Sequence, residues 1–239
     1  MIGSTRRANL RNIALPAQFS NDSSVATGWA SAYSRVMRKL AIAGAATLLL
    51  SSASAAQRIV GQGPIQSLPA PVLLDTTGMF LARYARVGDD FFVAGQPTER
   101  ALHELRKLGV TTVINLRMPQ EMERVGFDEA KLAESLGMKY VHIPMRGGDG
   151  EQAYSPQTLR KFADAMKAAD DKVLLHCTVA WRASHIWAAY LIQERGVADT
   201  AALAHARAIN LMDEHRMDGS GRQPVEMFLG RKVEGIRHP

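Results

Sequence analysis

The segment 172–195, KVLLHCTVAWRASHIWAAYLIQER, constrains the fold of this 239-residue chain more than any other. It begins with a short apolar run, KVLLHC, which is typical of a strand buried on both faces of a sheet. The loop CTVAWR follows at once and leads into an apolar helix that ends at Gly196. A buried strand that turns directly into a helix is typical of a parallel sheet covered by helices.

The rest of the segment 86–239 repeats this alternation of strands and helices. We expect strands at about 90–95, 110–117 and 139–145, where β-branched and aromatic residues gather. We expect helices at 99–109, 128–136 and 156–169, and two or three more between 197 and 229. Ser155 and Pro156 suit the cap and first turn of the third helix. The predicted fold is therefore α/β, with a twisted, mainly parallel sheet flanked by helices and a helical C-terminal tail.

The first 85 residues have a different organisation. Residues 57–85 contain several prolines and show no period, which indicates an extended segment leading into the domain at 86–239. Residues 37–56 combine a cationic start, an apolar run and small residues, as signal peptides do, with cleavage after Ala55 or Ala56. We interpret residues 1–36 as an upstream extension that precedes the true start at Met37. The apolar run is shorter than the ~20 residues of a membrane span. We therefore expect export to the periplasm or secretion, with no stable membrane span after cleavage.

The charge and the cysteine content narrow the partners. The net charge is +6, but residues 1–56 hold six Lys or Arg against one Asp, so the folded part is nearly neutral. No basic stripe is left for nucleic acid, and we predict no nucleic-acid partner. Cys177 is the single cysteine, so an exported chain has no internal disulfide.

Cys177 and Arg182 lie five positions apart in the loop between the buried strand and the helix. Ligands of such sheets bind beyond the carboxyl ends of the strands. Backbone N–H groups at the start of a helix bind anions and favour a thiolate, and an arginine binds an oxyanion through two N–H groups. The loop is thus predicted to be an anion cradle, although an inert buried cysteine is the plain alternative.

Four blocks of the sequence resemble the cysteine-dependent dual-specificity and tyrosine phosphatase superfamily, and more narrowly the bacterial beta-lactamase-hydrolase-like phosphatase family. They are FFVAGQPTERALHELRKLGVTTVINLR, YVHIPM, LLHC with the arginine after it, and HIWAAYLI. The resemblance covers about residues 86–195. It implies a twisted parallel sheet flanked by helices and an exported phosphatase that needs no cofactor or metal. Its substrate would be a phosphorylated protein or a small phosphoester.

The resemblance also implies roles for individual residues. Cys177 would attack phosphorus and form a phosphocysteine, and Arg182 would stabilise the phosphoryl oxygens. His176 would orient the loop, and Asp149 in the glycine-rich stretch RGGDGEQAY would be the general acid. The remaining residues in substrate-binding positions are Thr178, Val179, Ala180, Trp181 and Ser184.

The loop departs from the family pattern in two ways. Ala180 stands where a glycine is usual, and Ala183 stands where a hydroxyl residue is usual. The loop is also one residue shorter than that of most cysteine phosphatases, a spacing that rhodanese-type sulfurtransferases use. Two alternatives therefore stay open: a sulfurtransferase that works through a Cys177 persulfide, and a catalytically impaired phosphate-binding module.

Overall fold

The computed structural model describes residues 58–60, 68–212, 221–236 and 238. The chain divides into two units, Met1–Ser52 and Ala53–Pro239, and every described residue belongs to the second. The predicted extension at 1–36 and the predicted signal peptide at 37–56 lie outside the described residues. Within the described part of the chain, no helix is long and apolar enough to cross a membrane.

A six-stranded sheet of order β1-β2-β3-β6-β4-β5 forms the centre of the domain. The strands are β1 (Val72–Leu73), β2 (Tyr84–Val87), β3 (Phe91–Ala94), β4 (Val110–Asn115), β5 (Lys139–His142) and β6 (Lys172–His176). β3, β6, β4 and β5 are parallel to one another, whereas β1 and β2 join the sheet antiparallel at one side. The prediction of a mainly parallel α/β sheet is therefore confirmed.

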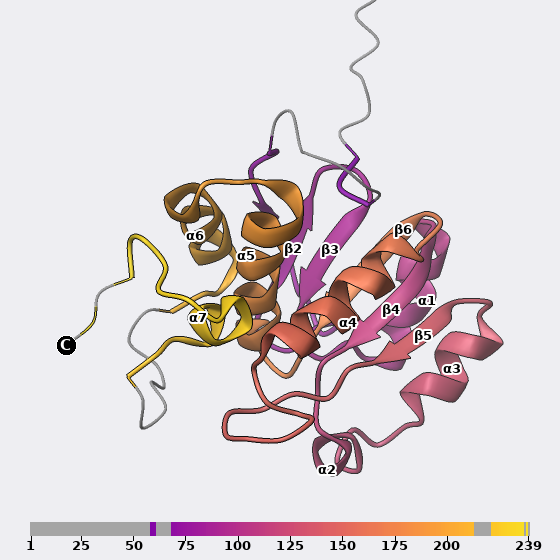
Figure 1. Ribbon diagram of the computed structural model, residues 1–239. Coiled ribbons are helices and arrows are strands. Elements are labelled where there is room, and N and C mark those ends of the chain that lie inside the picture. The colour runs from indigo at the N-terminus through magenta and orange to yellow at the C-terminus, as the bar shows by residue number, and fades with distance from the viewer. Residues whose placement is uncertain (1–57, 61–67, 213–220, 237, 239) are drawn as a thin grey trace, which may run out of the picture. The chain divides into compact units, whose positions relative to one another are not determined.

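Helices cover both faces of this sheet (Figure 1). The helices are α1 (Glu99–Lys107), α2 (Pro119–Met122), α3 (Glu129–Ser135), α4 (Pro156–Lys167), α5 (Trp181–Arg195), α6 (Asp199–Ile209) and α7 (Pro224–Leu229). The larger apolar cluster lies between one face of the sheet and α4 to α7, and the smaller one packs the other face against α1 and α3. The helical tail predicted between 197 and 229 is represented by α6 and α7.

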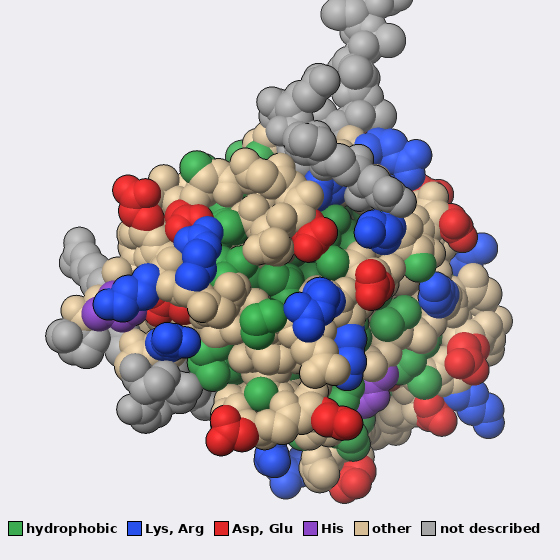
Figure 2. All heavy atoms as spheres, in the orientation of Figure 1, with side chains coloured by type: hydrophobic (Ala, Val, Ile, Leu, Met, Phe, Trp, Pro, Cys, Tyr) green, Lys and Arg blue, Asp and Glu red, His purple; other side chains and the backbone are tan. Residues whose placement is uncertain are grey.

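The surface over α4 and α5 shows where apolar side chains reach the outside. In Figure 2, hydrophobic side chains gather near the middle of this face, between α5 and α4. Lys, Arg, Asp and Glu side chains surround them in a mixture of both signs.

Side-chain caps fix where several helices begin. Thr98 accepts a hydrogen bond from the N–H of Ala101 at the start of α1, and Ser155 accepts one from the N–H of Thr158 at the start of α4. Such caps satisfy N–H groups that have no partner within the helix. Ser155 and Pro156 therefore begin α4 as the sequence predicts.

The segment before residue 86 belongs to the folded domain, which corrects the predicted boundary. β2 begins at Tyr84, and Ile59 and Val60 are buried in the main core. The buried carboxylate of Asp90 accepts hydrogen bonds from the N–H groups of both residues, at 2.7 and 3.1 Å. A short strand and a docked segment of this kind carry no periodic signal, because each contributes only two or three buried side chains.

Candidate active site

The carboxyl ends of three neighbouring strands meet at one edge of the sheet. Ala94 of β3 and Asn115 of β4 both lie in register with His176, the last residue of β6. The residues that follow these strands, Gln96, Arg117 and Cys177, therefore lie close together although they are far apart in sequence. This edge is where ligands bind in sheets of this type.

The loop after β6 is held against the loop after β3. Gly95 and Val179 form a β-bridge, and the N–H of Gln96 donates to the carbonyl of Thr178 at 3.0 Å. A Cβ on Gly95 would lie 1.6 Å from the carbonyl oxygen of Leu81, so only glycine fits at this close approach. The loop is thus fixed by backbone contacts, independently of its own side chains.

Ala180 has the left-handed backbone that the family's glycine would adopt without strain. Its φ is +64°, and it caps the start of α5. A left-handed conformation costs an L-residue about 1–2 kcal/mol relative to glycine. The alanine therefore raises the energy of the loop but leaves its shape intact.

The backbone N–H groups of residues 178–183 form the floor of a potential anion site. The N–H of Ala180 faces the carbonyl of Ala94 in the bridge between Gly95 and Val179, and the other five have no acceptor within the described part of the chain. Three of them, at 181–183, are the first N–H groups of α5, which have no partner within the helix. Successive free N–H groups at the start of a helix are a typical site for an oxyanion.

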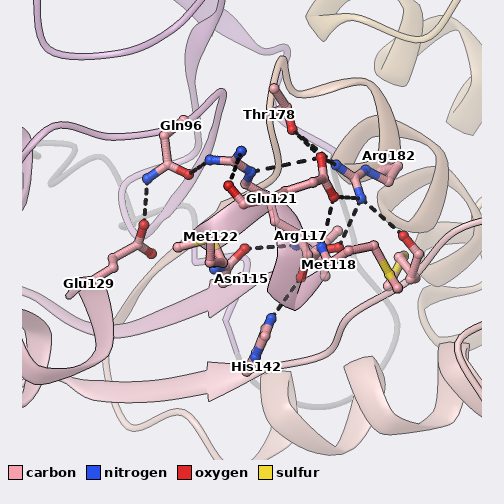
Figure 3. Close-up of polar contacts among 12 residues, drawn as sticks. Gln96, Asn115, Arg117, Met118, Glu121, Met122, Glu129, His142, Thr178 and Arg182 are labelled. Carbon is pink, nitrogen blue, oxygen red and sulfur yellow. Dashed lines mark hydrogen bonds and ion pairs between the residues drawn. The ribbon is translucent and has the colours of Figure 1, made fainter. Parts of the chain in front are cut away.

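Arg182 is held by the carboxylate of Glu121 from α2 (Figure 3). Its Nη1 donates to Oε2 at 2.8 Å and its Nη2 to Oε1 at 2.7 Å, which is a two-point pair. Nη1 also donates to the carbonyls of Leu116 and Met145, and Nη2 donates to Oγ1 of Thr178 at 3.0 Å. The terminal nitrogens of Arg182 are thus fully engaged by the protein, whereas Nε has no acceptor among the described residues.

Glu121 has its charge stabilised on several sides. Partial burial by itself would raise the pKa of this carboxyl, but hydrogen bonds from Arg182, from the N–H of Met118 and from Thr178 lower it to about 2. The donor distances from Met118 and from Thr178 are 2.7 and 2.8 Å. Burial would likewise lower the pKa of Arg182, but the bonds to Glu121 raise it above its ordinary value. The pair is therefore fully charged at neutral pH.

A second buried polar network lies on the other side of the loop. His176 Nε2 is 2.7 Å from Oε1 of Glu129, and both side chains are fully buried. Gln96 donates to the other oxygen of Glu129 at 2.5 Å and accepts from Nη1 of Arg117 at 2.6 Å (Figure 3). Burial would raise the pKa of Glu129, but His176, Gln96 and Arg117 lower it below its ordinary value. Arg117 Nη2 donates to the carbonyl of Glu121, which joins this network to the first.

A pocket of about 650 Å³ opens above the loop. Its polar lining consists of Glu121, Arg146, Gly147, Cys177, Thr178 and Arg182. Its apolar lining consists of Met118, Tyr154, Val179, Trp181, Met212, Pro224 and Met227. The thiol of Cys177 is almost wholly buried, so it lies at the floor. The wall is therefore apolar and rich in thioether and aromatic groups, and the charged groups lie near the floor and at one side.

The structure brings together most of the residues predicted from the sequence. Among them, Cys177, Thr178, Val179, Trp181 and Arg182 line the pocket.

Other predicted residues lie outside the pocket. His176 and Ala180 are buried and support the loop from below. Ser184 is buried too, and its hydroxyl donates to the carbonyl of Ala180 at 2.8 Å. In α5 the helix backbone takes this hydroxyl, and contact of Ser184 with substrate stays a prediction. Asp149 is exposed and does not line the pocket, although Arg146 and Gly147 of the same stretch do.

Sequence reasoning missed four polar residues of the site: Gln96, Arg117, Glu121 and Glu129. Glu121 and Arg117 follow the strand β4 directly, so the rule that functional side chains follow parallel strands could have identified them. Glu129 follows the helix cap Asp128, where an acidic residue is usual and needs no function. The described residues contain no group of three or more His, Cys, Asp or Glu that could hold a metal.

Comparison with known proteins places this site in context. Residues 83–194 match the family described as beta-lactamase hydrolase-like protein, phosphatase-like domain. P. aeruginosa TpbA is 18% identical with a TM-score of 0.47, over 70% of this chain and 94% of that chain. PTPMT1 is 19% identical with a TM-score of 0.47, over 61% of this chain and 90% of that chain. Tk-PTP in its active form is 22% identical with a TM-score of 0.41, over 51% and 80%. No curated protein sequence matches the chain.

Proposed function

We propose that this chain, whose residues 83–194 match the beta-lactamase hydrolase-like phosphatase-like domain, hydrolyses phosphomonoesters with Cys177 as nucleophile. The loop 177–182 carries this proposal. It combines a thiol at the floor of a pocket, five N–H groups without an acceptor among the described residues, and a largely buried arginine. These groups are what a transferring phosphoryl group requires, because its charge is spread over three oxygens.

The proposed reaction has two steps. In the first, the Cys177 thiolate attacks phosphorus, the bond from phosphorus to the ester oxygen breaks, and the leaving alcohol takes a proton. In the second, water attacks the phosphocysteine, gives up a proton, and the thiolate leaves with its electron pair. These five N–H groups and the Nε of Arg182 stabilise the phosphoryl oxygens in both steps. Glu121 keeps the guanidinium in one orientation by binding its two terminal nitrogens.

Asp149 is the proposed acid of the first step and base of the second. It is exposed in a stretch flanked by Gly148 and Gly150, whose φ values are +94° and +99°. The same stretch contributes Arg146 and Gly147 to the pocket. We propose that rotation at the two glycines carries the carboxyl toward the leaving oxygen, as in enzymes whose loops close over the substrate.

The pocket suits an ester with a sizeable apolar group. A volume of about 650 Å³ lies within the range of roughly 300–1,000 Å³ that holds a drug-sized ligand, so the phosphoryl group fills only the floor. Trp181 and Tyr154 form an aromatic corner, with ring centroids 6.5 Å apart. We therefore propose aryl and other apolar phosphomonoesters, free or on a protein side chain, as substrates of an exported enzyme.

The experiment is an assay of residues 57–239 on p-nitrophenyl phosphate and on 2-naphthyl phosphate. We expect Cys177→Ser to abolish turnover and an acid-quenched wild-type reaction to contain a phosphocysteine by mass spectrometry. Full activity of Cys177→Ser would refute the mechanism. Asp170→Asn, which changes an exposed residue that does not line the pocket, is the control variant and should retain wild-type activity.

The short spacing from cysteine to arginine favours one second candidate, sulfur transfer through a Cys177 persulfide. Thiocyanate formation from thiosulfate and cyanide, with no phosphocysteine trapped, would support this candidate instead. A third outcome, binding of vanadate without turnover of any phosphoester or of thiosulfate, would identify a phosphate-binding module.

A further inference from the structure

Arg117 lies at the same edge of the sheet as Cys177, on the face opposite to Arg182. Side chains alternate between the two faces along a strand, and residue 117 shares the parity of Val113, which packs in the cluster on the side of α1 and α3. Cys177 and Ala183 pack in the other cluster, on the side of α5. The two arginines are therefore supplied by two different layers of the domain.

The hydrogen bond from Arg117 to Gln96 crosses the end of the central strand. β6 lies between β3 and β4, and Leu116 N–H donates to the carbonyl of His176 at 3.0 Å. A bond of 2.6 Å joins Nη1 of Arg117, beyond β4, to Oε1 of Gln96, beyond β3. It must therefore pass next to the end of β6, where Cys177 follows.

The position of Arg117 is fixed by its neighbours. Asn115 Oδ1 accepts from its N–H at 2.8 Å, and Nε2 of His142 is 2.7 Å from its carbonyl oxygen (Figure 3). Its Nη2 donates to the carbonyl of Glu121 at 2.9 Å. The residue is only 7% exposed, and its Nε is buried without an acceptor among the described residues.

Charge pairing distinguishes Arg117 from Arg182. Arg182 is neutralised at contact by Glu121, and His176 is in contact with Glu129. Among the described residues, the guanidinium of Arg117 donates to an amide oxygen and a carbonyl oxygen, and the nearest carboxylate oxygen, Oε1 of Glu121, is 3.9 Å from Nε. The charged and titratable groups that surround it and the pocket floor are Glu121 on α2, Glu129 on α3, His176 on β6, Arg182 on α5, and Arg146 and Tyr154 in the pocket wall.

We propose that Arg117 is a positioning residue whose incompletely paired positive charge stabilises the thiolate of Cys177. The inference rests on the proposed role of Cys177 as nucleophile. Removal of a cation next to a thiol disfavours the thiolate, and a neighbouring opposite charge typically changes the thiolate population at least tenfold.

Alkylation tests this inference without any substrate. Cys177 is the single cysteine of the chain, so the rate of modification by iodoacetamide, followed by intact mass, reports on it alone. We expect Arg117→Met and Arg117→Gln to slow alkylation about tenfold at neutral pH and to move the pH profile of alkylation upward. Arg117→Lys keeps the charge and should retain most of the wild-type rate and profile. Arg86→Met, which removes an exposed arginine of β2, is the matched control.

Comparison of the three substitutions separates the effect of the positive charge of residue 117 on the alkylation rate from the effect of its side-chain shape. If Lys behaves like Met and Gln, or if all three alkylate with the wild-type pH profile, the proposal is overturned. Circular dichroism and urea unfolding show which variants are folded. If only Arg117→Gln and Arg117→Lys fold, the comparison between these two variants is enough to test the proposal. Absence of phosphatase activity together with the expected alkylation shift would refute the proposed function and leave the role of Arg117 standing.

Discussion

Replacement of Glu121 by glutamine should destabilise the fold in a way that depends on pH. The folded state lowers the pKa of this carboxyl from 4.5 to about 2, so folding favours its charged form. A lowering of that size corresponds to at most about 3 kcal/mol at neutral pH. The side chain is 32% exposed, and solvent screening reduces the expected loss in the Glu121→Gln variant to about 1–2 kcal/mol.

The sign of the pH dependence follows from the same pKa. Stability due to the ionised carboxyl is fully present above pH 4.5, and it declines as the pH falls from 4.5 toward 2. The difference in free energy of unfolding between wild type and Glu121→Gln should therefore be constant from pH 7 to pH 5 and shrink at pH 4 and pH 3.

Urea unfolding at these four pH values measures the difference directly. Glu123→Gln, which removes an exposed carboxyl one residue beyond α2, is the control and should show no comparable difference. A loss in Glu121→Gln that stays the same down to pH 3 would refute the reasoning, because it could not come from the ionised carboxylate. So would a variant as stable as wild type at pH 7.

Two further predictions concern the loops around the pocket. Asp149→Asn should lower kcat about a hundredfold for alkyl phosphates, because an alkoxide needs a proton in order to leave. The same substitution should lower kcat much less for p-nitrophenyl phosphate, whose leaving group needs no proton. If the two substrates are affected equally, or not at all, Asp149 is not the general acid. Gly95→Ala places a methyl carbon 1.6 Å from the carbonyl oxygen of Leu81, and because this atom is backbone we expect a loss of more than about 3 kcal/mol in urea unfolding. Gly147→Ala, whose φ is also not positive and where a Cβ would lie 3.8 Å from the ring of Tyr154, is the control for a glycine replaced without a clash.

The central strand and helix of the fold, and the loop between them, could be predicted because each is encoded by a short continuous stretch of sequence. β6 and α5 are each a continuous apolar segment, and the loop between them contains both Cys177 and Arg182. Ala180 stands where the resemblance leads one to expect a glycine, and its φ of +64° is one that glycine adopts without strain.

The partners of the cradle could not be predicted, because they depend on which strands become neighbours. The sequence order of the strands does not reveal that β6 lies between β3 and β4, and only this order places Gln96 next to Arg117. Glu129 was hidden for another reason. An acidic residue in the first turn of a helix is normally solvated, whereas here it is 2% exposed and contacts His176.

The docking of Ile59 and Val60 shows the same limitation. These residues are followed by a segment rich in proline, and nothing in their immediate surroundings indicates burial. Their partner is the carboxylate of Asp90, about 30 residues further along the chain.

The position of β6 in the sheet means that the surroundings of Cys177 form only when this last strand is inserted. β6 is the last strand in the sequence, yet it pairs with both β3 and β4. Until residues 172–176 insert, β3 and β4 have unpaired inner edges, and such edges invite pairing with other chains. The same insertion brings Cys177 between Gln96 and Arg117 and starts α5. Before β6 inserts, Cys177 is an ordinary thiol, and the surroundings that we propose to activate it form in the same event that covers the inner edges of β3 and β4.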